Sequence, residues 1–284
     1  MKILSEPLSI EKFSMAIAQL PASLEGTTLV HLSDFHYDGL LLTDALLAEV
    51  IEITNQAKPD LILLTGDYVT NSPKPIHKLA KELKFLESRA GTYAVLGNHD
   101  LYFPSSQEEI TTALTNVGIQ VLWNDIVYPL GKGLAIVGLP DFWSREFHPN
   151  PIMEQLDPDV PNIVLSHNPD SAEVLKPWRV DLQLSGHTHG GQIVIPGKGS
   201  VPSWIYASRH KIPEIFWPWI PFLKGKWPKV VQNWQWGQGY HQVGNNVLYV
   251  NRGLGTFPPG RWFCPPEVTI ITLTQKNEAE LISQ

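Results

Sequence analysis

Five apolar runs in this sequence each end in a short cluster of polar residues, and this recurrence limits the folds open to the chain. Each run has the length and composition of a buried strand that leads into a loop. Runs that are apolar throughout favour strands covered on both faces, as in layered α/β domains. The polar clusters would then lie at the carboxyl ends of the strands, where ligand sites usually form. The five runs with their polar ends are TLVHLSDFH, DLILLTGDY, TYAVLGNHD, NIVLSHNPD and DLQLSGHTH.

Amphipathic patterns between these runs predict helices. Apolar stripes at helical spacing indicate one helix over about 43–58 and a second over about 75–90. A third, over about 105–118, offers a serine–glutamate capping box at its start and a glycine at its end. A glycine turn within 126–139 predicts a hairpin, and 267–274 predicts a late strand.

The size of the chain fits one domain. Its 284 residues, 43% of them hydrophobic, suffice for a full core, so we expect a single domain over 1–284. No apolar run approaches the roughly 18 residues of a transmembrane helix. The first residues lack the compact apolar stretch of a secretory signal, so we expect a cytoplasmic protein.

Two features of the composition narrow the chemistry. Cys264 is the single cysteine, which excludes an internal disulfide and any metal site built from cysteines. A metal would therefore need nitrogen and oxygen ligands. The formal charge of -7 argues against general nucleic-acid binding, which requires a broad basic face.

The polar clusters are rich in metal-ligand side chains. Asp34 and His36 are two residues apart after the first run, so in extended backbone both project to one side. His187 and His189 repeat this spacing after the fifth run. The runs between them add three further donors, which are Asp67, Asn98 and His167. Two carboxylates, one amide and four imidazoles exceed the needs of one ion, so the set predicts two.

The order of these motifs resembles that of the calcineurin-like metallophosphoesterase superfamily, which is D-x-H, G-D, G-N-H-D/E, H and G-H-x-H. Within that superfamily the strings VLGNHD, LSHNPD, GHTHGGQ and VNRGLG, with a late CPPE, resemble the YkuE/YaeI-type bacterial branch. This branch includes relatives that act on UDP-2,3-diacylglucosamine. The resemblance implies an α/β fold, specifically a four-layer α/β/β/α sandwich of the metallophosphoesterase type.

The resemblance also implies a role for each donor. One metal would be held by Asp34, His36 and His189. The other would be held by Asn98, His167 and His187. Asp67 would bridge the two ions, a role that spacing alone does not assign.

A two-metal site implies hydrolysis by a hydroxide that bridges the metals, because the ions lower the pKa of a shared water toward about 7. We expect His99 to contact the phosphate or protonate the leaving group, and Asp100 to orient its ring. Arg252 could bind a substrate phosphate as a bidentate donor, or form a structural ion pair. The mixed ligand set suits Mn, Fe, Co or Zn better than Mg or Ca.

The segment over about 197–246 is an insert of unusual composition. It holds six of the ten tryptophans and six basic residues against one acidic residue, and it shows no periodic pattern. Basic residues beside exposed aromatics suit an anionic lipid headgroup or a membrane surface. The alternative is a long loop that covers the site with its own aromatics buried.

These features predict a metal-dependent phosphoesterase. The bond cleaved would be a phosphoester or a pyrophosphate, in a phosphorylated small molecule or a lipid-linked or nucleotide-sugar-like substrate. A phosphatase for soluble or cell-wall phosphates, with the insert as a lid, is one alternative. Another is a binding module that has lost catalysis, although the sequence fills every motif position.

Overall fold

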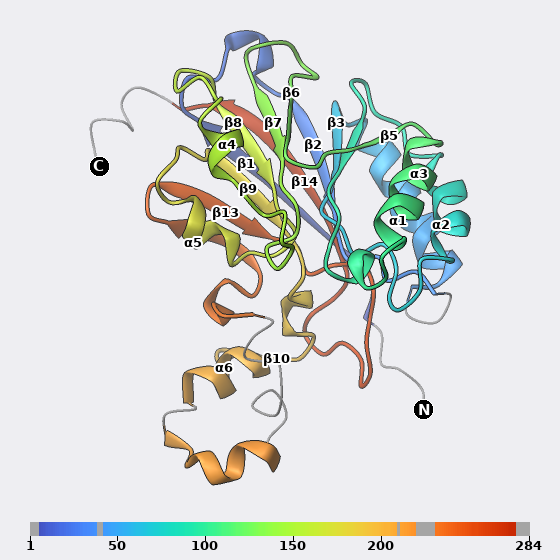
Figure 1. Ribbon diagram of the computed structural model, residues 1–284, viewed down its shortest axis with the longest axis vertical. Coiled ribbons are helices and arrows are strands. Elements are labelled where there is room, and N and C mark those ends of the chain that lie inside the picture. The colour runs from blue at the N-terminus through green and yellow to red at the C-terminus, as the bar shows by residue number, and fades with distance from the viewer. Residues whose placement is uncertain (1–5, 39–41, 209–210, 220–230, 277–284) are drawn as a thin grey trace.

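The computed structural model describes residues 6–38, 42–208, 211–219 and 231–276. Two six-stranded sheets form the body of the protein (Figure 1). The first sheet has the order β1-β14-β2-β3-β4-β5. Its strands are β1 (Ser9–Ile17), β14 (Glu267–Gln275), β2 (Thr28–Leu32), β3 (Leu61–Leu64), β4 (Thr92–Ala94) and β5 (Ile119–Val121).

The second sheet has the order β12-β13-β9-β8-β7-β6. Its strands are β12 (Gly239–Val243), β13 (Asn246–Val250), β9 (Leu182–Ser185), β8 (Asn162–Leu165), β7 (Ala135–Gly138) and β6 (Asp125–Val127). A short ribbon outside both sheets pairs β10 (Val194–Ile195) with β11 (Gly199–Ser200).

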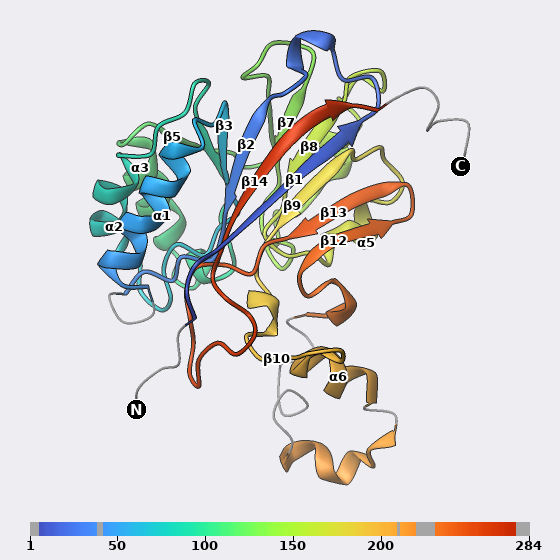
Figure 2. The ribbon, with the colours of Figure 1, turned by 180° about the vertical axis from the view of Figure 1, so that it is seen from behind.

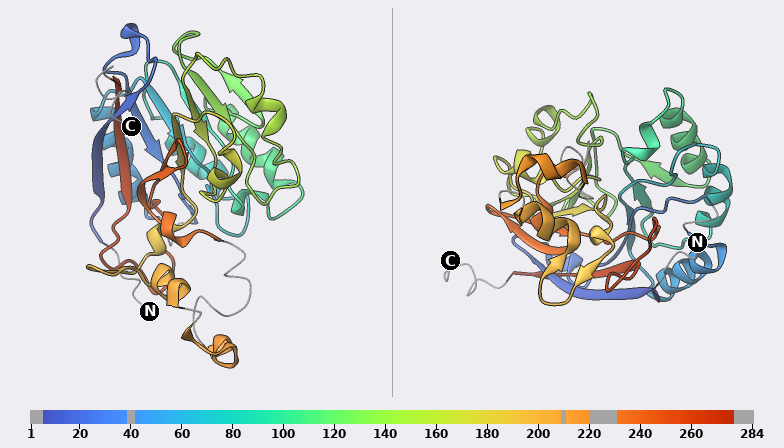
Figure 3. Two further views of the ribbon diagram at one scale, coloured as in Figure 1. Left: turned by 90° about the vertical axis from the view of Figure 1, so that its left-hand side faces the viewer. Right: turned by 90° about the horizontal axis from the view of Figure 1, so that it is seen from below.

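The sheets pack face to face, and helices cover their outer faces (Figure 3). In β3, Leu61 and Leu63 pack between the sheets, whereas Ile62 and Leu64 pack against the helices. Both faces of the strand are therefore buried, which explains its continuous apolar run. The predicted four-layer α/β/β/α sandwich is confirmed. The helices are α1 (Asp44–Gln56), α2 (Ile76–Leu83) and α3 (Ser106–Thr115) on the first sheet, and α4 (Asn150–Met153) and α5 (Ser171–Leu175) on the second.

The five predicted site strands are confirmed as β2, β3, β4, β8 and β9. Strands β2, β3 and β4 run parallel in the first sheet, and β8 and β9 run parallel in the second. Because parallel strands end at the same edge, their polar loops gather at one end of the sandwich. The predicted hairpin and late strand are also confirmed, as the β6–β7 pair and β14.

One predicted helix end and one predicted helix cap were wrong. Helix α2 ends at Leu83 rather than near residue 90, because the side chain of Asn55 bonds to the backbone of Phe85 and Glu87 beyond it. Helix α3 has no capping box, because Ser105 has helical backbone angles and its side chain makes no capping bond. A capping box needs an extended residue at that position.

The insert contains regular structure that its composition did not predict. Helix α6 (Val201–Ser208) and the 3-10 helix η5 (Glu214–Trp219) extend beyond the end of the sheets (Figures 1 and 2). A second 3-10 helix, η6 (Trp234–Trp236), buries Trp234 and Trp236. Trp227 lies outside the described residues, as do four of the six basic residues. No helix within the described ranges has the length and hydropathy of a membrane span.

His31 is fully buried in β2. Its Nε2–H donates to the Thr65 hydroxyl at 2.8 Å, and that hydroxyl donates to Ser33 Oγ at 2.7 Å. Burial lowers the pKa of His31 to about 3. The folded protein therefore keeps this ring neutral where the unfolded chain would protonate it.

We predict that His31 makes the protein acid-sensitive. The unfolded ring binds a proton below about pH 6.5 and the folded ring does not, so stability falls as pH drops from there toward 3. Between about pH 7.5 and about pH 5 the loss from this residue should be about 2 kcal/mol. Urea unfolding of the His31→Gln variant should show a smaller loss than the parent. The exposed His77→Gln variant should behave like the parent, and an equal loss in all three proteins would contradict this assignment.

Candidate metal centre

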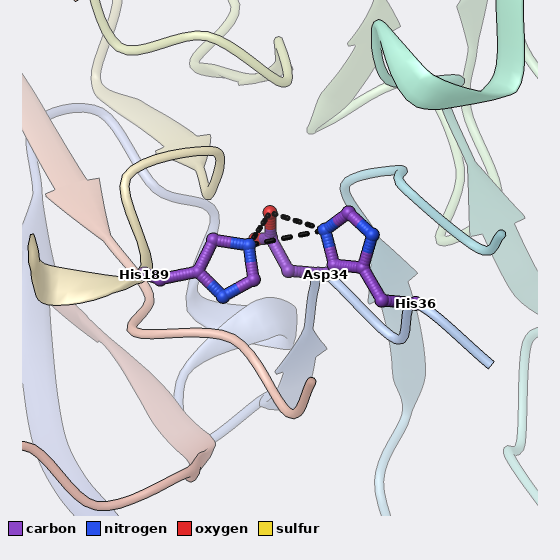
Figure 4. Close-up of side chains that lie close together, drawn as sticks. All are labelled: Asp34, His36 and His189. Carbon is purple, nitrogen blue, oxygen red and sulfur yellow. Dashed lines mark hydrogen bonds and ion pairs between the residues drawn. The ribbon is translucent and has the colours of Figure 1, made fainter. Parts of the chain in front are cut away.

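Six of the seven predicted ligands are buried, and Asn98 is half-buried. Each follows one of the five site strands, so the topology brings them to one edge of the sandwich. The first group holds Asp34, His36 and His189 (Figure 4). His36 Nε2 lies 3.0 Å from His189 Nε2, and each nitrogen lies within 3.9 Å of Asp34 Oδ1. Donor atoms from β2 and β9 thus converge across the two sheets.

The second group holds Asp67, His167 and His187. His167 Nε2 lies 3.1 Å from Asp67 Oδ2 and 3.2 Å from His187 Nδ1. Asn98 Oδ1 is buried and makes no hydrogen bond within the described part of the chain. A buried carbonyl oxygen of this kind is costly unless a ligand satisfies it.

Asp67 joins the two groups. Its Oδ2 lies 3.4 Å from His36 Nε2 and 3.1 Å from His167 Nε2. Its Oδ1 accepts the backbone N–H of His99 at 2.8 Å, which fixes the plane of the carboxylate. One carboxylate oxygen therefore faces imidazole nitrogens of both groups.

Two backbone carbonyls set the histidine tautomers. His167 Nδ1–H donates to Thr65 O at 2.6 Å, and His189 Nδ1–H donates to Gly255 O at 3.2 Å. Each ring thereby presents Nε2 to the cluster. This arrangement is usual for metal-binding histidines, because the outer hydrogen bond fixes the ring and raises its basicity.

The loops that carry the donors have unusual backbone angles. Positive φ occurs at Asp34 (52°), His36 (43°), Asp67 (55°), His187 (72°) and His189 (50°). Non-glycine residues rarely adopt such angles, and such strain concentrates at functional sites. The fold therefore holds five donors in costly conformations to aim their side chains inward.

Glycines allow the loops to approach one another. A Cβ at Gly97 would lie 2.2 Å from Asp67 Oδ1. A Cβ at Gly186 would lie 2.1 Å from Asp34 Oδ2. Both distances are far below van der Waals contact, so the glycines of the GNHD and GHTH motifs make room for the two carboxylates.

The electrostatics of the cluster fit a cation. Burial lowers the pKa of His189 well below its usual value, and His36 adds to this effect, so the ring is neutral and can ligate. Burial also disfavours charge on His167, but Asp67 and Asp34 outweigh it and raise the pKa of His167 to about 10. Without a metal, this ring therefore carries a proton that balances the carboxylates. The facing nitrogens, the unpaired Asn98 oxygen and the carboxylates all fit divalent metals.

His99 lies against this cluster. Its ring meets that of His36 edge-on at 4.7 Å between centroids. Its Nδ1–H donates to Thr70 O at 2.6 Å, and its Nε2 accepts the Tyr102 hydroxyl at 3.2 Å. Burial lowers the pKa of His99. Nε2 is thus the atom that a substrate could reach.

The prediction that Asp100 orients the His99 ring was wrong, because Thr70 makes that bond. The buried carboxylate of Asp100 instead accepts the backbone N–H groups of Asp67, Tyr68, Val69 and Gly97 at 2.9 to 3.3 Å. It ties the loop after β3 to the loop after β4. Its contribution is to hold Asp67 in place.

The guanidinium of Arg252 does not point into the metal cluster but forms ion pairs elsewhere. That group pairs with Glu11 Oε1 at 2.5 Å and with Glu267 Oε2 at 2.8 Å. These residues line a separate pocket of about 510 Å³ that contains none of the seven donors. The structure therefore favours the ion-pair alternative over a phosphate contact.

Two residues near the site were not predicted from the sequence. Arg261 is fully buried and donates to four backbone carbonyls, among them Gly255 O, which it fixes for His189. No motif surrounds it. Asp141 follows β7 as the other donors follow their strands, and the string LAIVGLPDF could have revealed it. Burial raises the pKa of Asp141 to about 6.

Comparisons with known proteins agree with this geometry. The family model described as calcineurin-like phosphoesterase matches residues 27–191. Phosphodiesterase YaeI of Escherichia coli is 32% identical over 251 residues, which cover 86% of this chain and 81% of that protein. UDP-2,3-diacylglucosamine pyrophosphatase LpxG of Chlamydia muridarum is 27% identical over an alignment 311 positions long, which covers 93% of this chain and 88% of that protein.

A solved structure shares the fold. The protein TT1561 of Thermus thermophilus covers 81% of this chain and 90% of its own, with a TM-score of 0.50 and 13% identity. The chain belongs to the calcineurin-like phosphoesterase family, and the predicted bacterial branch is confirmed. It is a phosphoester hydrolase.

We predict that metal binding releases protons. His167 is protonated at about pH 8 in the metal-free protein because its pKa is about 10, and a metal must displace that proton to reach Nε2. Calorimetric titration of Mn²⁺ in buffers of different ionisation enthalpy should show at least about one proton released per chain, and a second if the shared water also ionises. Binding without any dependence on the buffer would contradict the placement of His167 as a ligand.

Proposed function

We propose that this protein is a two-metal hydrolase of phosphodiester or pyrophosphate bonds. The observation that carries the proposal is the position of Asp67, whose Oδ2 faces His36 on one side and His167 on the other. A carboxylate oxygen shared by two sets of nitrogens suits a pair of adjacent ions rather than one. The first ion would be held by Asp34, His36 and His189, the second by Asn98, His167 and His187, with Asp67 bridging.

The donor set also bears on the kind of metal. Four imidazoles beside two carboxylates favour Mn, Fe, Co or Zn over Mg or Ca, which prefer oxygen-only shells. When bound, such ions would supply hydroxide from a shared water at neutral pH and neutralise charge on the phosphoryl oxygens.

His99 would handle the proton of the leaving group. With Nδ1–H committed to Thr70 O, Nε2 is the only ring atom able to exchange a proton. An anionic phosphate that replaces the Tyr102 hydroxyl at Nε2 would favour the doubly protonated ring, whatever burial does to its pKa. The proton on Nε2 can then be transferred to the leaving-group oxygen, as general acid catalysis requires.

The substrate we propose is lipid-linked or nucleotide-sugar-like. The similarity to a UDP-2,3-diacylglucosamine pyrophosphatase supports it. So does the insert, whose helices expose at least half of the surface of four large apolar side chains. These are Trp204 (50%), Ile215 (76%), Phe216 (55%) and Trp219 (84%). The described basic residues Lys198 and Lys211 are exposed nearby in the chain, which suits contact with an anionic membrane.

We predict that the Mn²⁺-loaded protein cleaves bis(p-nitrophenyl) phosphate faster than p-nitrophenyl phosphate. Asp67→Asn should lower kcat by at least about a hundredfold, because losing a bridging charge costs several kcal/mol of transition-state stabilisation. Mass spectrometry of metal content should find two ions per chain in the parent and fewer in the variant.

The exposed His77→Ala variant is the control, and it should match the parent in rate and metal content. Equal, low rates in the parent and in Asp67→Asn would favour the binding module instead. Preference for the monoester, with both ions bound, would favour the general phosphatase.

We predict that the insert binds anionic vesicles. Flotation with phosphatidylglycerol vesicles should carry the protein upward, and Trp219→Ala combined with Phe216→Ala should reduce this, because tryptophan and phenylalanine partition to the membrane interface. Phe85→Ala removes an aromatic ring as exposed as Phe216 but outside the insert, and it should leave flotation unchanged. A parent protein that stays at the bottom of the gradient would exclude the membrane contact.

A further inference from the structure

A pocket of about 430 Å³ opens beside the candidate metal centre. It lies between the loop that follows β4 and the loop that follows β7, and Asn98 lines it. Since Asn98 is also a candidate metal ligand, the pocket adjoins the candidate metal centre. A group esterified to a phosphorus atom at that centre has this pocket within reach.

Asp141 is the one buried residue in the lining of the pocket. Its Oδ1 accepts the backbone N–H of Trp143 at 3.0 Å. Its Oδ2 is buried and has no hydrogen-bond partner among the described residues. A buried acceptor without a partner is costly, so its presence points to a donor that arrives with a ligand.

Aromatic side chains form the rim. Tyr102, Phe103 and Trp143 line the pocket and expose about half of their surfaces (52%, 50% and 46%). Large aromatic rings that remain exposed around a pocket offer stacking surfaces for a flat ring. A sugar would need several donors and acceptors around its hydroxyls. Among the described lining groups, Asp141 Oδ2 is the one buried acceptor without a partner that is not also a candidate metal ligand, and the aromatic rings of the same pocket suit a flat ring with an N–H on its edge.

We propose that this pocket binds a nucleobase of the substrate, with Asp141 Oδ2 accepting an N–H from the edge of the base. The proposal rests on the hydrolytic function proposed above, and it assigns the substrate class to nucleoside phosphates. It also assigns a specificity role to Asp141, which belongs to none of the metal-binding groups.

The test compares three diesters of p-nitrophenol on the Mn²⁺-loaded enzyme. They are p-nitrophenyl thymidine 5′-phosphate, its N3-methyl derivative, and p-nitrophenyl phenyl phosphate. The thymidine ester should have the highest kcat/KM. Methylation removes the N–H and should lower kcat/KM about tenfold to a hundredfold, the range for a buried group that loses its partner.

Two variants test whether Asp141 and Phe103 cause the preference for the thymidine ester. Asp141→Asn should turn a donor toward the base, because its oxygen remains with the Trp143 N–H. The ratio of kcat/KM between the thymidine and N3-methyl esters should then approach one. Phe103→Ala should weaken the preference for thymidine over phenyl, whereas Phe85→Ala, of similar exposure but outside the pocket, should not.

The outcomes separate the two proposals. Cleavage of the esters with no effect of N3-methylation would overturn the nucleobase pocket alone. Cleavage of none of them would overturn the hydrolytic function and the pocket together. The methylation test needs only the parent enzyme, so it tests the nucleobase pocket even if Asp141→Asn fails to fold.

Discussion

The architecture of this end of the protein depends on bringing two carboxylates and four imidazoles into contact in a space almost closed to water. Such a cluster repels itself unless positive charge is added, and it forces loops from two sheets into van der Waals contact. The neighbouring features follow from this demand. Glycine stands where a Cβ would strike Asp67 or Asp34. Asp100 gathers four backbone N–H groups, and Arg261 gathers four carbonyls, so that opposite partial charges lock the loops.

Much of this could be predicted from the sequence because each donor sits at the end of an apolar run. Strands that are buried on both faces can be recognised in the sequence by their continuous apolar runs. Because parallel strands end at the same edge of a sheet, their ends then lie together. The bridging role of Asp67 came only from the family resemblance. The roles of Asp100 and Arg261 could not be predicted, because hydrogen bonds to distant backbone groups leave no local pattern. For Arg252 the sequence left two alternatives open, because its carboxylate partners Glu11 and Glu267 lie far from it along the chain. The predicted end of α2 was wrong for the same reason, since the bonds beyond Leu83 come from Asn55 of another helix.

The candidate centre lies between two dissimilar regions. On the side of β4 and β7 lies an aromatic pocket, where the buried acceptor of Asp141 is not part of the candidate metal centre. On the side of β9 the insert begins, and α6 packs near the short helix η3 (His189–Gly191) that carries His189. A compact monoester would use neither region fully. A substrate with a different group on each side of its phosphate would contact both, which agrees with a diester or a pyrophosphate.

The position of β14 has a consequence for synthesis. Although it is the last strand along the chain, it lies inside the first sheet, parallel to β1 and antiparallel to β2. Among the described strands, β1 is therefore synthesised before all others but pairs only with β14, which is synthesised after the rest. Cores of the second sheet can form earlier, since domains begin to fold as they emerge. A nascent chain that does not yet include β14 thus exposes the edges of β1 and β2, and chaperone binding there would protect these edges until β14 emerges.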